Sequence, residues 1–136
     1  MNNIEQTLSI IKPDAVERNL ENEIKDLFKN KGFQIIKEKK IKIEKSEAEK
    51  FYKVHETKPF YNDLCEYLSS GPIVAMVLEK NNAILENREV MGATNPLDAK
   101  EGTIRKKFGI SIDKNSVHGS DSVENAKIEI DFFFKD

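Results

Sequence analysis

The sequence is poor in the residues that mark several classes of protein. Among its 136 residues there are no tryptophans, one cysteine and two histidines. The single cysteine, Cys65, excludes an internal disulfide framework and any zinc site built from several cysteines. The longest apolar run, at 73–78, is too short to cross a bilayer. Residues 1–5 hold no basic segment followed by an apolar one, so we expect no secretory signal and a cytoplasmic protein.

Arginine is also scarce, because 19 of the 22 basic residues are lysine and only three are arginine. With 24 acidic residues the net charge is −2, which argues against stable binding to nucleic acid through its phosphates. Hydrophobic residues make up 38% and charged residues 34%, a composition typical of a folded soluble domain. No repeat or Pro/Gly/Ser-rich linker interrupts the chain, so we expect a single domain over residues 1–136.

The hydrophobic pattern predicts strands that alternate with helices. Strands are expected at 7–11, at 33–43 and, because the run is continuously apolar, as a buried central strand at 73–78. A fourth strand is expected near 115–118, and helices in the segments between and after the strands. The fold class is therefore α+β, with a four-stranded antiparallel sheet and helices packed on it in the ferredoxin-like βαββαβ arrangement.

Several local details follow from single residues. Ser46 is expected to cap a helix that runs on through Tyr52 and Val54. Residues 92–102 form a long loop rich in turn residues, which is usually a functional feature, and 109–112 should be an edge segment. The last helix should begin after Asp121-Ser122 and bury one stripe of apolar residues: Val123, Ala126, Ile130, Phe133 and Phe134.

The most informative stretch is 115–122, Asn-Ser-Val-His-Gly-Ser-Asp-Ser. It places His118 in a loop just before a helix start, where glycine permits close approach and the helix N-terminus favours an anion. Histidine is a competent nucleophile near neutral pH when its other ring nitrogen is held by an acceptor. Glu129, two turns into the following helix, is placed to supply that acceptor. On its own, a loop histidine is more often a structural hydrogen-bonding residue.

The same stretch resembles the active-site signature of the nucleoside diphosphate kinases. Other segments resemble further motifs of that family in the same order along the chain: Ile11-Lys12-Pro13-Asp14, Lys58-Pro59-Phe60, and residues 70–76, 92–96 and 102–105. The resemblance implies exchange of γ-phosphate between nucleotides by a ping-pong route that maintains the NTP and dNTP pools. In that route His118 takes the phosphoryl group from a nucleoside triphosphate, typically ATP, and passes it to a nucleoside diphosphate.

The resemblance also implies roles for individual residues. Lys12 matches the lysine that reaches the transferring phosphate and the ribose, and Tyr52 the tyrosine that braces this cluster. Ser120 and Glu129 match the residues that orient His118. The nucleotide contacts are expected from Arg88, Thr94 and Arg105 for the phosphates, Asn115 for the sugar, and Phe60, Leu64 and Ile112 for the base.

Each of these residues has an ordinary alternative reading. Lys12 could be one more solvated lysine, Tyr52 and Phe60 half-buried aromatic residues, Arg88 and Arg105 members of weak surface ion pairs, and Glu129 part of a solvated helix face. A surface or structural role is expected for the other histidine, His55, and a place in the core for Cys65. Arg18 is expected to be an ordinary surface arginine.

The expected cofactor is Mg²⁺ carried by the substrate phosphates, with no metal site built from protein side chains. The expected partners are nucleoside tri- and diphosphates and further copies of the chain, in a tetramer or a hexamer of dimers, with no stable nucleic-acid or membrane partner. Two other functions fit the fold class. An RNA-binding or metabolite-sensing domain is disfavoured because the central strand at 73–78 has no aromatic residues. A phosphohistidine signalling module or a silent nucleotide-binding relative is disfavoured by the intact motifs.

Overall fold

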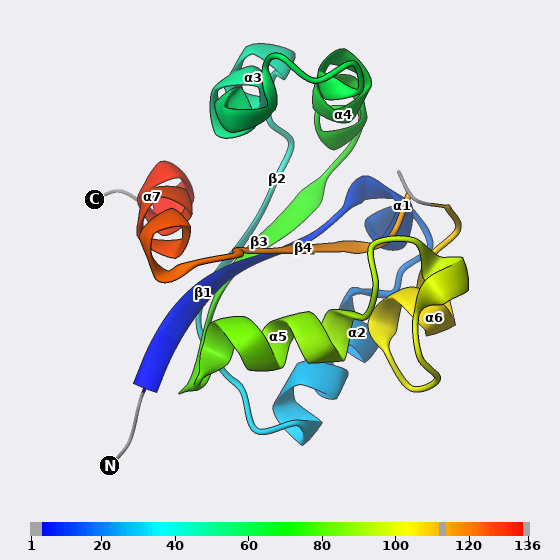
Figure 1. Cartoon of the computed structure of the whole chain (residues 1–136), viewed down its shortest axis with the longest axis vertical. Helices are drawn as coiled ribbons and strands as arrows, with labels where there is room; N and C mark the ends of the chain where they lie inside the picture. Colours follow the sequence, from blue (N-terminus) through cyan, green and yellow to red (C-terminus); the bar gives the residue numbers. More distant parts are fainter. Residues whose placement is uncertain (1–3, 112–113, 135–136) are drawn as a thin grey trace.

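The computed structural model describes residues 4–111 and 114–134. Four strands form one antiparallel sheet in the order β2-β3-β1-β4 (Figure 1). They are β1 (Ile4–Ile11), β2 (Gln34–Ile41), β3 (Ile73–Asn81) and β4 (Val117–Gly119). The predicted α+β, ferredoxin-like architecture is confirmed, with a helical pair inserted between β2 and β3 and a further helix after β4.

Helices cover both faces of the sheet (Figure 1). One face carries the inserted pair α3 (Lys45–Phe51) and α4 (Tyr61–Leu68) together with α7 (Val123–Phe134). The other carries α1 (Pro13–Glu17), α2 (Glu21–Asn30), α5 (Ala83–Met91) and α6 (Ile104–Phe108). Two short 3₁₀ turns, η1 (Lys53–His55) and η2 (Pro96–Asp98), complete the described elements. None of the described helices combines the length and apolarity that crossing a membrane requires.

The two central strands divide the core into two clusters. Along β3, Ile73 and Ala75 point toward α3, α4 and α7, whereas Val74 and Met76 point toward the opposite helices. Side chains alternate between the faces of a strand, so a strand with helices on both faces is apolar at every position. This is the physical reason for the continuous apolar run at 73–78, and the predicted central strand is confirmed.

Some local expectations were wrong at the start and end of α3. The helix begins after Glu44 rather than Ser46, and the Glu47 side chain accepts a hydrogen bond from the Glu44 N–H at 3.1 Å. The helix stops at Phe51, and Tyr52 joins it to η1. The N-cap residue of α3 is therefore Glu44 and not the hydroxyl residue Ser46, because the Glu47 side chain reaches back across the first turn to the Glu44 N–H.

Three further expectations were wrong near the C-terminal end. Residues 109–111 are not in a strand, and Ile112 lies outside the described residues. In the apolar stripe predicted for α7, only Ala126 and Phe133 are fully buried. Val123, which was expected to be buried, is 46% exposed. The loop predicted at 92–102 is confirmed, and it contains the turn η2. The fourth strand predicted near 115–118 is present as β4, so His118 lies within a strand rather than in a loop, and α7 begins at Val123.

Candidate active site

His118 is held between the sheet and the last helix. It lies opposite Ile10 in the β1–β4 pair, and its Nε2 is 3.0 Å from Glu129 Oε1 of α7. The Ser120 hydroxyl donates to the same carboxylate oxygen at 2.7 Å and accepts from the Leu8 N–H at 3.2 Å. A carboxylate can only accept, so this contact favours the tautomer with the proton on Nε2 and the lone pair on Nδ1.

Two aromatic rings at the C-terminal end of α3 support the imidazole. Phe51 meets it edge-on at a centroid distance of 5.3 Å, and Tyr52 does so at 6.3 Å. Tyr52 is only 5% exposed. Burial, and after it the negative charge of Glu129, raise the pKa of the Tyr52 hydroxyl well above its ordinary value. The hydroxyl is therefore protonated at neutral pH.

A buried polar chain links the end of β1 to the loop at 92–102. Lys12 Nζ donates to Asn115 Oδ1 at 2.9 Å, and Asn115 Nδ2 donates to the Thr94 carbonyl at 3.1 Å. Lys12 and Asn115 are 6% and 2% exposed. A lysine is buried to this degree only when its ammonium group is paired, so Lys12 is not a solvated surface lysine.

Two arginines meet at a cavity of about 940 Å³. Arg105 is buried, and its guanidinium donates to the Gly92 and Val117 carbonyls at 3.0 and 2.9 Å. Burial, with the nearby charge of Arg88 second, lowers the pKa of Arg105 to about 10, so it remains cationic at neutral pH. Arg88 is exposed on the cavity wall.

The same cavity is bounded by residues from several loops and from the end of β4: Gly92, Thr94, Gly102, Gly119 and Asp121. Its described lining includes Gly119, next to His118, but neither His118 nor Lys12. Two cationic side chains that open onto one cavity favour an anionic ligand, and the planar fork of arginine suits a phosphate.

Phe60 lies apart from this cluster, at the start of α4. It is 46% exposed, and its ring centroid is 5.8 Å from that of His55, which in turn lies 6.2 Å from Tyr52. An exposed aromatic face of this kind is suited to stacking on a flat ligand. Leu64 packs against the α3–α4–α7 core cluster. Cys65 is fully buried in that cluster, as expected.

The comparison with known families decides the identity of this arrangement. The family model of nucleoside diphosphate kinase matches residues 5–136. The chain belongs to the nucleoside diphosphate kinase family. It is accordingly an enzyme, a phosphotransferase.

Individual relatives agree with the family match. The chain is 58% identical over 132 residues to a nucleoside diphosphate kinase of Campylobacter jejuni, covering 97% of this chain and 96% of that protein. It is 56% identical over 131 residues to one of Persephonella marina, covering 96% and 94%. The solved structure of the Aquifex aeolicus nucleoside diphosphate kinase superposes with a TM-score of 0.95 at 43% identity, over 97% of this chain and 96% of that one.

Most of the site residues expected from the kinase family lie close together. One group surrounds the imidazole: His118, Ser120, Glu129 and Tyr52. A second is the Lys12–Asn115–Thr94 chain, and a third the two arginines at the cavity. Phe60 and Leu64 are on α4 and its N-terminal side, and Ile112 lies outside the described residues. The roles of all these residues remain predictions.

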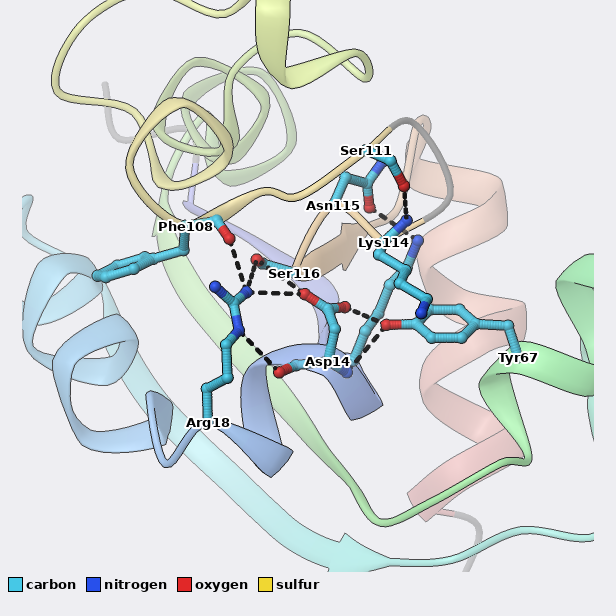
Figure 2. Close-up of polar contacts among 9 residues, drawn as sticks. Asp14, Arg18, Tyr67, Phe108, Ser111, Lys114, Asn115 and Ser116 are labelled. Atoms are coloured by element: carbon cyan, nitrogen blue, oxygen red, sulfur yellow. Dashed lines mark hydrogen bonds and ion pairs between the residues drawn. The ribbon is translucent and has the colours of Figure 1, made fainter.

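Sequence reasoning missed a neighbouring group centred on Asp14 and Arg18 (Figure 2). Arg18 was expected to be ordinary, but it pairs with the Asp14 carboxylate at 3.0 Å and donates to the Phe108 carbonyl at 2.6 Å. The spacing of four residues on a helix was the available signal, since such residues share a face. Phe51, whose ring contacts the imidazole of His118, was also missed. Apart from its position next to Tyr52, nothing in the sequence around Phe51 indicates this contact.

Proposed function

We propose that this enzyme exchanges the terminal phosphate between nucleoside triphosphates, typically ATP, and nucleoside diphosphates by a ping-pong route through phosphohistidine on His118, and so maintains the NTP and dNTP pools. The observation that carries the proposal is the 3.0 Å contact between His118 Nε2 and Glu129. This contact supports the proposal because it favours the tautomer in which Nδ1 carries the lone pair that a nucleophile needs.

In the first half-reaction the Nδ1 lone pair forms a bond to the γ-phosphorus, while the bond from that phosphorus to the β–γ bridging oxygen breaks. The electron pair of the broken bond leaves with the nucleoside diphosphate. The imidazole ring gains positive charge as the N–P bond forms, and the Glu129 carboxylate on Nε2 stabilises that charge. The second half-reaction reverses these steps with a different nucleoside diphosphate.

Charge neutralisation supplies most of the remaining catalysis, since a loose phosphoryl-transfer transition state leaves charge on the outer oxygens. We assign this role to Lys12, Arg88 and Arg105, with Thr94 as a further phosphate contact. Asn115, paired with Lys12, is assigned to the sugar. Phe60, with Leu64 and Ile112, is assigned to the base, and stacking on a ring face tolerates any base.

We further propose Mg²⁺ as the cofactor, bound to the substrate phosphates. Within the described residues no group of three or more His, Cys, Asp or Glu side chains is arranged to hold a metal ion. Asp121, on the wall of the cavity shared by both arginines, fits an acceptor for the water ligands of a cation that arrives with the nucleotide. Such a cation neutralises charge on the β- and γ-phosphates.

The remaining proposals concern assembly and location. We propose a homo-oligomer, a tetramer or a hexamer of dimers, which acts in the cytoplasm without a stable nucleic-acid or membrane partner. The position of β2 at one edge of the sheet supports assembly, because an edge strand presents unpaired backbone groups. Light scattering on the purified chain tests the proposed assembly, and a monomer would contradict it.

The phosphohistidine proposal is tested with ATP labelled at the γ-phosphate. We expect an acid-labile label on the protein, which GDP and Mg²⁺ then remove as labelled GTP. His118→Ala should lose labelling and exchange while nucleotide binding, measured by calorimetry, stays largely intact. Equal loss of binding and labelling would indicate a structural histidine instead.

The second histidine provides a matched control. His55→Gln should still acquire label on His118, because His55 contacts the rings of Tyr52 and Phe60 but not the imidazole that reacts. Label that disappears in His55→Gln and persists in His118→Ala would overturn the assignment of the nucleophile.

A further inference from the structure

Ser116 has a backbone conformation that its residue type rarely adopts. Its φ is +76°, and the Val117 N–H donates across it to the Asn115 carbonyl at 2.9 Å. A three-residue turn closed in this way, with positive φ at its centre, is uncommon and strained for any residue except glycine. The turn lies between Asn115 and His118, so its shape sets how these two side chains are placed.

The turn is held by contacts from the end of β1, from α1 and from Arg18, whose guanidinium donates to the Ser116 hydroxyl at 3.4 Å. The Lys12 N–H donates to the Ser116 carbonyl at 2.8 Å, and the Ser116 hydroxyl donates to Asp14 Oδ2 at 3.2 Å. Ser116 is fully buried and Asp14 is 5% exposed. A hydrogen bond between two buried groups is not lost to competing water, so it can hold a strained turn in place.

The Asp14 carboxylate is itself fixed from several directions (Figure 2). Arg18 donates to Oδ2 at 3.0 Å and to the Asp14 carbonyl at 3.1 Å, and Tyr67 of α4 donates its hydroxyl to Oδ1. Arg18 also reaches the Phe108 carbonyl at the end of α6. The Asp14 carboxylate, which accepts from Ser116, is thus connected to three helices: its own helix α1, α4 through Tyr67, and α6 through Arg18.

We propose that Asp14 is a positioning residue, which holds the strained turn at Ser116 and thereby places Asn115 and His118 relative to Lys12. The proposal rests on the phosphohistidine function, because it concerns the geometry of that site. Lys12 meets the turn twice, through its N–H to Ser116 and through its ammonium group to Asn115. Relaxation of the turn would loosen both contacts at once.

Glycine at position 116 provides the decisive variant, since glycine adopts positive φ without a steric cost. If Asp14 serves to hold Ser116 in this conformation, a glycine there should make Asp14 largely dispensable. If Asp14 serves only to pair Arg18 or to anchor α4, a glycine at 116 should not compensate for its loss.

The first readout is the single-turnover rate at which His118 acquires label from γ-labelled ATP. We expect Asp14→Ala to slow labelling about 10- to 100-fold, the range that follows from a small displacement of reacting groups. Asp14→Asn, which keeps an acceptor oxygen, should retain most of the rate. Asp14→Ala combined with Ser116→Gly should recover most of what Asp14→Ala loses.

Tyr67→Phe is the matched control, because it removes another contact of the same carboxylate without touching the turn. Its effect should not change when Ser116→Gly is added. Should Asp14→Ala fail to fold, Ser116→Ala and Ser116→Gly provide the comparison. Alanine keeps a Cβ at positive φ without the hydroxyl, so it should label more slowly than the glycine variant.

The second readout, hydrogen exchange of the Lys12 amide, does not depend on activity. Asp14→Ala should accelerate this exchange, and the added Ser116→Gly should restore its protection. If the unaltered enzyme acquires no label, the proposed function is wrong, whereas the exchange data still decide whether Asp14 holds the turn. If the enzyme is labelled but glycine restores neither labelling nor protection, the positioning role is wrong.

Discussion

The ring of Phe51 packs edge-on against the imidazole of His118, with the two ring planes at 71°. Phe51 also contacts Tyr52, Phe132 and Phe133, at centroid distances of 5.0–5.5 Å. A single aromatic side chain of α3 thus joins the imidazole of His118 to the core between α3 and α7. The orientation of His118 depends on packing as well as on its hydrogen bond to Glu129.

Replacement of Phe51 should affect both stability and rate. Phe51→Leu loses its edge-to-face contacts, so we expect the free energy of unfolding to fall by about 1 kcal/mol and labelling of His118 to slow. Phe132→Leu is the matched control, because Phe132 contacts Phe51 and Phe133 but makes no ring contact with His118 in the described structure. Urea unfolding and single-turnover labelling measure the two effects, and an equal rate loss in both variants would contradict the prediction.

The two arginines at the cavity should respond differently to substitution. Arg88 is exposed, so Arg88→Gln should change the free energy of unfolding by less than about 0.5 kcal/mol while raising the KM for nucleotides. Arg105→Gln should weaken nucleotide binding and also cost about 1–3 kcal/mol, because the Gly92 and Val117 carbonyls lose their donor. Thermal unfolding with and without ADP separates the loss of nucleotide binding from the loss of stability. Equal stability of the two variants would argue against a structural role for Arg105.

The buried Tyr52 hydroxyl should make the protein less stable at high pH. Its pKa is raised in the folded state, so between its ordinary value near 10 and the folded value the unfolded chain has released a proton that the folded chain retains. Stability is therefore fully present below about pH 10 and falls as the pH rises further. Each such proton contributes a slope of about 1.4 kcal/mol per pH unit.

Tyr52→Phe removes this titration, so its unfolding free energy should fall less steeply than that of the unaltered protein. Urea unfolding at intervals from about pH 9 to 11.5 measures the difference. Other groups that titrate in this range contribute equally to both proteins and cancel in the comparison. Parallel curves for the two proteins would show that Tyr52 does not titrate differently in the folded state.

Gly119, next to His118, should tolerate no side chain. A Cβ at this position would overlap the amide of Asn87 and lie 2.8 Å from Met91 Cε. Gly119→Ala should therefore cost about 1–3 kcal/mol of stability by overpacking. Asn87 makes no side-chain hydrogen bond among the described residues, so Asn87→Ala added to Gly119→Ala should recover most of that loss. Urea unfolding that shows no recovery would place the strain elsewhere.

Parts of this structure follow from local sequence because local and tertiary preferences agree. The run at 73–78 is apolar at each position since helices cover both faces of β3, and such a run has few alternatives. Glu129 falls near His118 because seven residues of helix bring it back along the strand end. In both cases the local sequence contains the information that predicts the structure: a continuous apolar run in the first and the distance along the chain in the second.

Other parts depend on partners far away in sequence. Arg18 gives no local sign that it reaches the Phe108 carbonyl, 90 residues later. Positive φ at Ser116 is equally hidden, because serine has no preference for it and distant contacts with Lys12 and Asp14 stabilise it. The N-cap at Glu44 could not be predicted because several acidic and hydroxyl residues near the start of α3 are possible caps. Which of them caps the helix depends on where its first turn begins.

The place of β4 at the edge of the sheet has a consequence for how the enzyme is made. Among the described strands it pairs with β1 alone, and Lys12 and Asn115, which meet there, are 103 residues apart. β4, with the proposed nucleophile His118, and α7, with Glu129, follow all other described elements. A chain emerging from the ribosome can thus build its three longer strands before it holds the residue to which we assign phosphate transfer. If His118 and Glu129 act as proposed, activity requires that α7 has been released and has folded back, so phosphoryl transfer would report completion of the fold.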